Sequence, residues 1–155
     1  MSALRGLSLA IELATRQREE ALAALVQAHR ALQGAQGQMG QLDSYAAETE
    51  SHWALGARNQ IGPEIVHHYD QFMVRLQQAV DLQRAVVADQ DASLAAARQR
   101  VMQAEVRIAG LKRLLEKRQA AQARAGALQE QKQLDELAAL QFRRFHPSPE
   151  MTEAP

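Results

Sequence analysis

The stretch VADQDASLAAARQRVMQAEVRIAGLKRLL, residues 87–115, carries a branched apolar side chain at every seventh position. These side chains are Val87, Leu94, Val101, Ile108 and Leu115. A second column, three residues further on, repeats with the same period and contains Gln90, Ala97, Ala104 and Leu111. Two interleaved columns of this kind are the a and d positions of a coiled coil. A strict seven-residue repeat over so many turns predicts a left-handed supercoil.

The same period fills most of the remaining chain. Ahead of the quoted stretch it continues through Tyr69, Met73, Leu76, Val80 and Gln83. A separate run has a positions at Leu4, Ile11, Arg18, Leu25, Leu32, Met39, Ala46 and Trp53, and d positions at Leu7, Ala14, Ala21, Ala28, Ala35, Leu42 and Thr49. Alanine, leucine, glutamine, arginine and glutamate dominate the chain, and aromatic residues make up 4% of it. The sequence therefore predicts an all-α protein.

The segment ARNQIGP, residues 57–63, separates the two runs. Gly56 can end a helix in the left-handed conformation, and Pro63 suits the first turn of the next helix. Ile61 and Val66 are spaced as a hydrophobic staple around that start. We therefore expect an antiparallel two-helix coiled-coil hairpin without a pocket, with a first helix at about 4–56, a turn at 57–62 and a second helix at about 63–145.

The second helix is expected to be longer than its partner and to overhang it. If the chain folds back near residue 58, Leu4 lies opposite residues 111–114. Beyond Leu115 the a and d positions become Arg118, Gln122, Ala125, Gln129 and Lys132, which cannot continue a dry seam. The overhang would extend about 45 Å to residue 145. After it, His146-Pro147-Ser148-Pro149 ends the helix, and residues 146–155 are expected to be a disordered tail.

An apolar stripe runs along the overhanging part of the second helix. It consists of Leu134, Leu137, Ala138, Phe142 and Phe145. The hairpin cannot cover this stripe, and an uncovered stripe of this kind usually binds a partner. A short fold-back of the terminal turns and self-association through the stripe are the alternatives.

The composition and the motifs argue against catalysis and against several kinds of ligand. The chain has no cysteine, a net charge of zero and no glycine-rich phosphate loop or nucleophile elbow. His67 and His68 are adjacent, whereas a two-histidine metal face needs a spacing of three or four residues. No apolar run approaches the roughly 18 residues that span a membrane. We expect a cytoplasmic protein that is not an enzyme, with no cofactor, no metal, no nucleic-acid partner and no direct membrane insertion.

Basic residues cluster between positions 98 and 124. They are Arg98, Arg100, Arg107, Lys112, Arg113, Lys117, Arg118 and Arg124, opposed in that interval only by Glu105 and Glu116. The cluster fits either a solvated helix face or a docking site for an acidic partner.

A patch of flanking residues near the turn is a candidate binding surface. Tyr45 and Gln38 occupy g positions of the first helix, and Phe72 and Ala79 occupy g positions of the second. In an antiparallel pair the two g rows share one edge, where Tyr45 would face Phe72 beside Leu42 and Leu76. Half-covered aromatic side chains are suitable binding anchors. Alternatively, Tyr45, Trp53, Tyr69 and Phe72 only cap a thin core.

Three segments resemble the FliJ family of flagellar type III export components. They are Gln38-Met39-Gly40-Gln41-Leu42-Asp43-Ser44-Tyr45, Phe72-Met73-Val74-Arg75-Leu76-Gln77-Gln78-Ala79 and Glu130-Gln131-Lys132-Gln133-Leu134-Asp135-Glu136. Their order and spacing, and the hairpin layout, are similar to the family over about residues 1–142. Thr49 and Gln83 depart from it, because the family favours tyrosine at the first position and often has histidine at the second.

The resemblance implies a cytoplasmic stalk that is peripherally associated with the inner membrane at the flagellar base. Its paired ends would enter the hexameric export ATPase, and it would also contact the cytoplasmic domain of the export gate and handle export chaperones. The implied gate contacts are Gln38, Leu42, Tyr45, Phe72, Leu76 and Ala79. The implied ATPase contacts are Leu7, Ile11, Arg113, Lys117, Arg118, Leu134, Leu137 and Phe142.

Two other functions remain open at this point. One is an injectisome export stalk of the same architecture, and the other is a passive coiled-coil adaptor or homodimeric scaffold. We expect the free chain to be a monomer, because closing a short loop costs less entropy than joining two chains.

Overall fold

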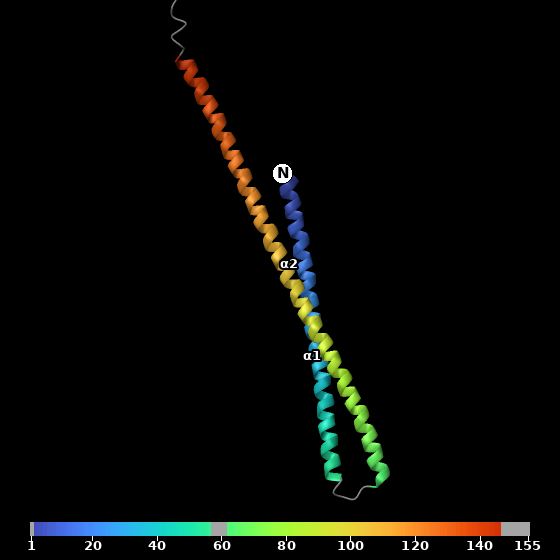
Figure 1. Ribbon diagram of the computed structural model, residues 1–155. Helices are drawn as coiled ribbons and strands as arrows, with labels where there is room; N and C mark the ends of the chain where they lie inside the picture. The colour runs from blue at the N-terminus through green and yellow to red at the C-terminus, as the bar shows by residue number, and fades with distance from the viewer. Residues whose placement is uncertain (1, 57–61, 147–155) are drawn as a thin grey trace, which may run out of the picture. The chain divides into compact units, whose positions relative to one another are not determined.

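The computed structural model describes residues 2–56 and 62–146. It contains two helices, α1 (Ser2–Gly56) and α2 (Pro63–Phe145), and the described residues include no β-strand (Figure 1). The two helices pack against each other through their apolar faces. The prediction of an all-α helical hairpin is therefore confirmed.

The chain divides into two compact units, and both helices contribute to each of them. Unit 1 consists of Met1–Glu12 with Ile108–Pro155, and unit 2 consists of Leu13–Arg107. Within unit 2 the helices run antiparallel, because contacts move from Trp53–Tyr69 through Tyr45–Phe72 to Ala35–Gln83. The residue numbers thus fall along α1 while they rise along α2.

Burial follows the predicted heptad columns. Every predicted a and d residue, from Leu4 to Trp53 in α1 and from Tyr69 to Leu115 in α2, is buried or half-buried. The most deeply buried side chains belong to these columns and are Ala14, Leu32, Ala35, Leu76, Val80, Leu94, Ala97, Val101 and Ile108. None of them is completely enclosed, because a two-helix seam has no third layer to cover it.

The start of α2 is formed by Gly62 and Pro63. The amides of Ile65 and Val66 donate to the carbonyl oxygen of Gly62 at 3.2 and 3.3 Å, so Gly62 occupies the capping position. Pro63 then takes the first helical position, where its missing N–H has no partner to lose. The rest of the expected turn, residues 57–61, and residues 147–155 of the expected tail lie outside the described residues.

Unit 1 contains one short paired section and one long exposed section. Leu4, Leu7 and Ile11 of α1 are half-buried, and in α2 Ile108 is 4% exposed and Leu111 and Leu115 are half-buried. From residue 116 to residue 145 every residue of α2 is exposed. The seam thus ends at Leu115, where the sequence predicts it to end.

Replacing a seam leucine should destabilise the fold, whereas the same change on the outer face should not. We expect Leu94→Ala to lower the free energy of unfolding by about 2–5 kcal/mol, because Leu94 is 4% exposed and its removal leaves a cavity. Leu82→Ala, at a side chain that is 70% exposed in the same helix, should change it by about 0.5 kcal/mol or less. Urea denaturation followed by circular dichroism measures both. Equal losses would contradict the seam.

Candidate functional site

Tyr45 of α1 and Phe72 of α2 form the centre of the candidate site in unit 2. Their ring centroids lie 6.0 Å apart with an interplanar angle of 80°, an edge-to-face contact across the two helices. Both rings remain accessible, at 51% exposure for Tyr45 and 39% for Phe72. The structure thus brings together two aromatic residues that are far apart in the sequence and leaves them open to a partner.

The other members of the predicted gate patch differ in how far they reach the surface. Leu76 is 7% exposed and belongs to the seam, while Leu42 and Ala79 are half-buried. Gln38 is exposed. A partner could therefore contact the two aromatic rings and Gln38 directly, with Leu42 and Leu76 supporting them from below.

Gln83 connects this patch to the seam through two hydrogen bonds. Its Nε2 donates to the carbonyl oxygen of Ala35 at 2.9 Å and to Oε1 of Gln38 at 3.2 Å. Both acceptors lie on α1, so the side chain links the two helices and orients Gln38. Position 83 is one of the two that depart from the FliJ pattern. The sequence placed Gln83 at a d position of the seam but did not predict its hydrogen bonds.

Thr49 is the other position that departs from the FliJ pattern, and it is bonded to the backbone of a patch residue. Its Oγ1 donates to the carbonyl oxygen of Tyr45 at 2.8 Å, one helical turn earlier. The hydroxyl group is therefore bonded to the backbone and adds no aromatic surface. The exposed aromatic area of this site comes from Tyr45 and Phe72.

A second aromatic pair has a different role. Trp53 and Tyr69 stack face to face with ring centroids 4.0 Å apart and an interplanar angle of 7°. Both residues are half-buried seam positions. Partial burial, together with the negative charges of Glu50 and Asp70, raises the pKa of Tyr69 above its ordinary value of 10.0. This pair covers the thin core, whereas Tyr45 and Phe72 extend beyond it.

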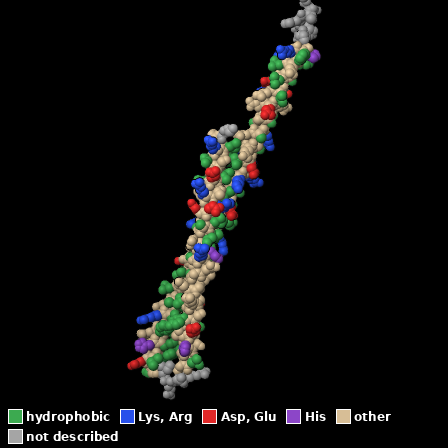
Figure 2. Space-filling view, turned by 180° about the vertical axis from the view of Figure 1, so that it is seen from behind, with side chains coloured by type: hydrophobic (Ala, Val, Ile, Leu, Met, Phe, Trp, Pro, Cys, Tyr) green, Lys and Arg blue, Asp and Glu red, His purple; other side chains and the backbone are tan. Residues whose placement is uncertain are grey.

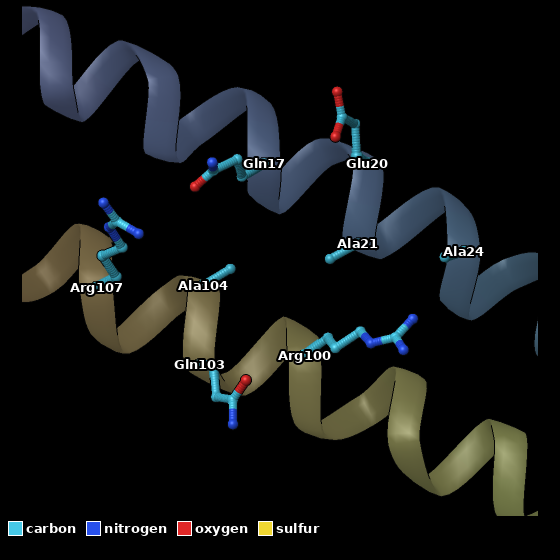
Figure 3. Close-up of a pocket in the computed structure, with 8 residues that line it drawn as sticks. All are labelled: Gln17, Glu20, Ala21, Ala24, Arg100, Gln103, Ala104 and Arg107. Carbon is cyan, nitrogen blue, oxygen red and sulfur yellow. The ribbon is translucent and has the colours of Figure 1, made fainter.

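Unit 2 also contains an open groove that the sequence reasoning did not anticipate. Its volume is about 420 Å³, and Figure 3 shows its lining side chains, which are Gln17, Glu20, Ala21, Ala24, Arg100, Gln103, Ala104 and Arg107. The hairpin was expected to have no pocket. The signal that could have predicted the groove is the run of small d residues on both helices, since Ala21 and Ala104 are d residues and both line it.

The predicted ATPase contacts all lie in unit 1. Leu7 and Ile11 are half-buried in its paired section, and Arg113, Lys117 and Arg118 are exposed. Leu134, Leu137 and Phe142 are 65%, 57% and 65% exposed. One face of this part of α2 is visible in Figure 2, where hydrophobic side chains alternate with charged ones. The ring of Phe142 stacks on His146 at 4.8 Å and is otherwise open.

Two features are absent from the residues that the structure describes. In those residues no three metal-ligating side chains come together. Neither α1 nor α2, as described, contains a stretch apolar enough for a membrane crossing.

The comparison with protein families identifies the chain. The family model described as "Flagellar FliJ protein" matches residues 5–146. The chain belongs to the FliJ family. The match includes both candidate surfaces, and the family points to a component of the flagellar export apparatus. No curated protein matches the chain.

The stacked pair allows a pH measurement in this FliJ-family chain. In a Tyr45→Phe background Tyr69 is the only tyrosine, so the ultraviolet absorbance of tyrosinate reports its ionisation alone. Because the pKa is raised in the folded state, we expect a midpoint above 10.0. The stability that this shift contributes is present below pH 10 and is lost as the pH rises through the folded pKa.

Trp53→Ala is the control for this titration. It removes the ring that covers Tyr69, and the midpoint should fall toward 10.0. A midpoint at or below 10.0 in the parent variant would contradict the effect of burial.

Proposed function

We propose that this chain is a non-catalytic stalk that joins the flagellar export ATPase to the export gate by binding both. The observation that carries this proposal is the continuous exposure of α2 from residue 116 to residue 145, with an apolar stripe on one side. A helix of this length and polarity pattern needs a partner to cover its stripe. Membership of the FliJ family supports an ATPase ring as that partner.

The ATPase surface would lie in unit 1. Leu134, Leu137 and Phe142 are each more than half exposed, and complete burial of such a side chain contributes about 1.5–3 kcal/mol. Exposed Arg113, Lys117 and Arg118 supply positive charge to the same unit. We infer that the ring encloses the stripe and that the basic residues orient the chain within it.

The gate surface would lie in unit 2. Tyr45 and Phe72 hold each other in an edge-to-face contact before any partner arrives, so little side-chain entropy is lost on binding. Aromatic anchors of this kind carry most of the energy of many interfaces. The hydrogen bond from Gln83 fixes Gln38 beside them in the same way.

The proposed role requires no cofactor and no catalytic group on this chain. Nucleotide chemistry would belong to the ATPase, and coupling would arise because one α2 helix passes through both units and so through both contacts. We further propose that the free chain is a monomer, that it acts at the cytoplasmic side of the inner membrane at the flagellar base, and that it also escorts export chaperones. It would not bind nucleic acid or insert into the membrane.

The flagellar system is favoured over an injectisome because the matching family model is that of the flagellar protein. A passive adaptor remains the alternative function. It would bind the ATPase and the gate without altering ATP hydrolysis.

The gate contact is tested with a double aromatic variant. We expect Tyr45→Ala combined with Phe72→Ala to weaken capture of the gate's cytoplasmic domain at least about tenfold, because both anchors are lost. Leu82→Ala removes an exposed side chain elsewhere on α2 and should leave capture unchanged. Surface plasmon resonance compares the three proteins. Unchanged binding by the double variant would exclude this patch.

The ATPase contact is tested by placing one charge on or off the stripe. Leu140 follows Leu134 by six residues, which puts it about 120° away around the helix. The two are similarly exposed, at 61% and 65%. We expect Leu134→Glu to weaken ATPase binding about tenfold and to reduce any change in hexamer formation or ATP hydrolysis, because a buried charge is costly. Leu140→Glu should have little effect.

Truncation after Arg118 completes the ATPase test. It should abolish ATPase binding while gate capture by the Tyr45 and Phe72 surface persists. If the truncated chain still altered ATP hydrolysis, or if both glutamate variants were equally impaired, the stripe would not be the ATPase contact.

A further inference from the structure

The groove on the g edge of unit 2 belongs to neither surface of the proposed stalk. In Figure 3, Ala21 of α1 and Ala104 of α2 point toward one another, and Ala24 lies further along α1. All three are small, so the two helices leave an open hollow of about 420 Å³ at this level. A floor made of methyl groups allows another backbone to approach closely.

The edges of the groove are basic. Arg100 and Arg107 line it from α2, and both are exposed. Within the described part of the chain neither makes an ion pair, since the ion pairs there are Arg18 with Glu19 and Arg84 with Asp81. Glu20 is the one carboxylate among the lining residues, and Figure 3 shows it pointing away from α2.

The heptad positions explain why these arginines lack partners inside the fold. In coiled coils, charged g residues commonly pair with opposite charges on the facing helix. Here the g residues of α1 in unit 2 that line the groove are Gln17 and Ala24, which are uncharged. Arg100 therefore contributes no charge pair to the seam and is available to another molecule.

We propose that this groove binds an acidic amphipathic helix of a partner protein. Arg100 and Arg107 are seven residues apart on one face of α2, about 10.5 Å along its axis. A helix lying along α2 would match them with carboxylates that are also seven residues apart. Small apolar side chains between those carboxylates would contact the alanine floor and complete a local three-helix packing.

Charge and composition favour a protein helix over a nucleic acid. The lining residues include no aromatic side chain on which a base could stack. The chain as a whole carries no net charge, so long-range attraction to a polyanion is weak. Amide groups of Gln17 and Gln103 can bond to a polar helix edge.

The test uses the full chain and a fluorescent, alanine-rich helical peptide of about 20 residues with glutamates seven residues apart. A peptide with glutamine in place of glutamate is its control. Fluorescence anisotropy should show binding of the glutamate peptide and at least tenfold weaker binding of the glutamine peptide. Equal binding of the two peptides, or no binding of the glutamate peptide, would overturn the proposal.

Variants of the chain then locate the peptide. Arg100→Glu with Arg107→Glu should weaken binding about tenfold or more, since two partly exposed pairs become repulsive. Ala24→Trp fills the groove without changing charge and should weaken binding as well. Circular dichroism verifies that each variant is folded.

Arg98→Glu is the matched control, because Arg98 lies two residues away on the same helix but lines a different groove, with Leu25 and Leu94. It should leave binding unchanged. Loss of binding in Arg98→Glu but not in the double variant would place the peptide on the opposite edge and overturn the proposal. So would preferential binding of an RNA oligonucleotide, or self-association of the parent chain that the double variant abolishes.

Discussion

Packing of the a and d columns of α1 against those of α2 is the interaction on which the rest of the structure depends. Among the described residues it is the source of nearly all burial, and the nine most buried apolar residues there belong to it. Ion pairing contributes little, because Arg18–Glu19 and Arg84–Asp81 are local contacts along one helix and three of the four side chains are exposed. A two-helix seam also leaves every buried side chain in reach of solvent at its margins, so the outer faces of both helices remain surfaces.

The unequal lengths of the two helices follow from the same constraint. α1 has 55 residues and α2 has 83, and the apolar columns of α2 are buried or half-buried only as far as Leu115. Beyond that point the a and d positions turn polar, and apolar residues reappear on a stripe that none of the described residues of unit 1 covers. The sequence of α2 thus changes its pattern where its pairing with α1 ends. In the function proposed above, one continuous helix serves for folding in its paired part and for binding in its unpaired part.

The seven-residue period of the sequence was sufficient to predict the fold and the position of the patch around Tyr45 and Phe72. It was not sufficient to predict which hydrogen bonds the polar side chains make. The burial of Leu94 and Val101 was predictable from their seven-residue spacing alone. The contact between Tyr45 and Phe72 was predictable from the register of the two helices. The bonds from Gln83 to Ala35 and Gln38 do not follow, because they depend on a rotamer that the heptad position leaves free. Arg18 is similar: its seam position was predicted, but not that its Nη2 reaches Glu19 while its Nε is buried without a partner. The groove lined by Ala21 and Ala104 was not predicted, because an alanine at a seam position is compatible both with closely packed helices and with an open gap between them.

The thin core and the exposed apolar residues are two consequences of one architecture. A globular domain hides its leucine and phenylalanine side chains in a second layer, but here Leu134, Phe142 and Tyr45 have none available. Covering such residues with further protein would stabilise the chain, so partners that bind them also add to its folding stability by mass action. The aromatic end of unit 2 shows how the fold limits this dependence: Trp53 and Tyr69 protect the last layers of the seam by stacking on each other, and Tyr45 and Phe72 are then left exposed without loss of the pairing between the helices.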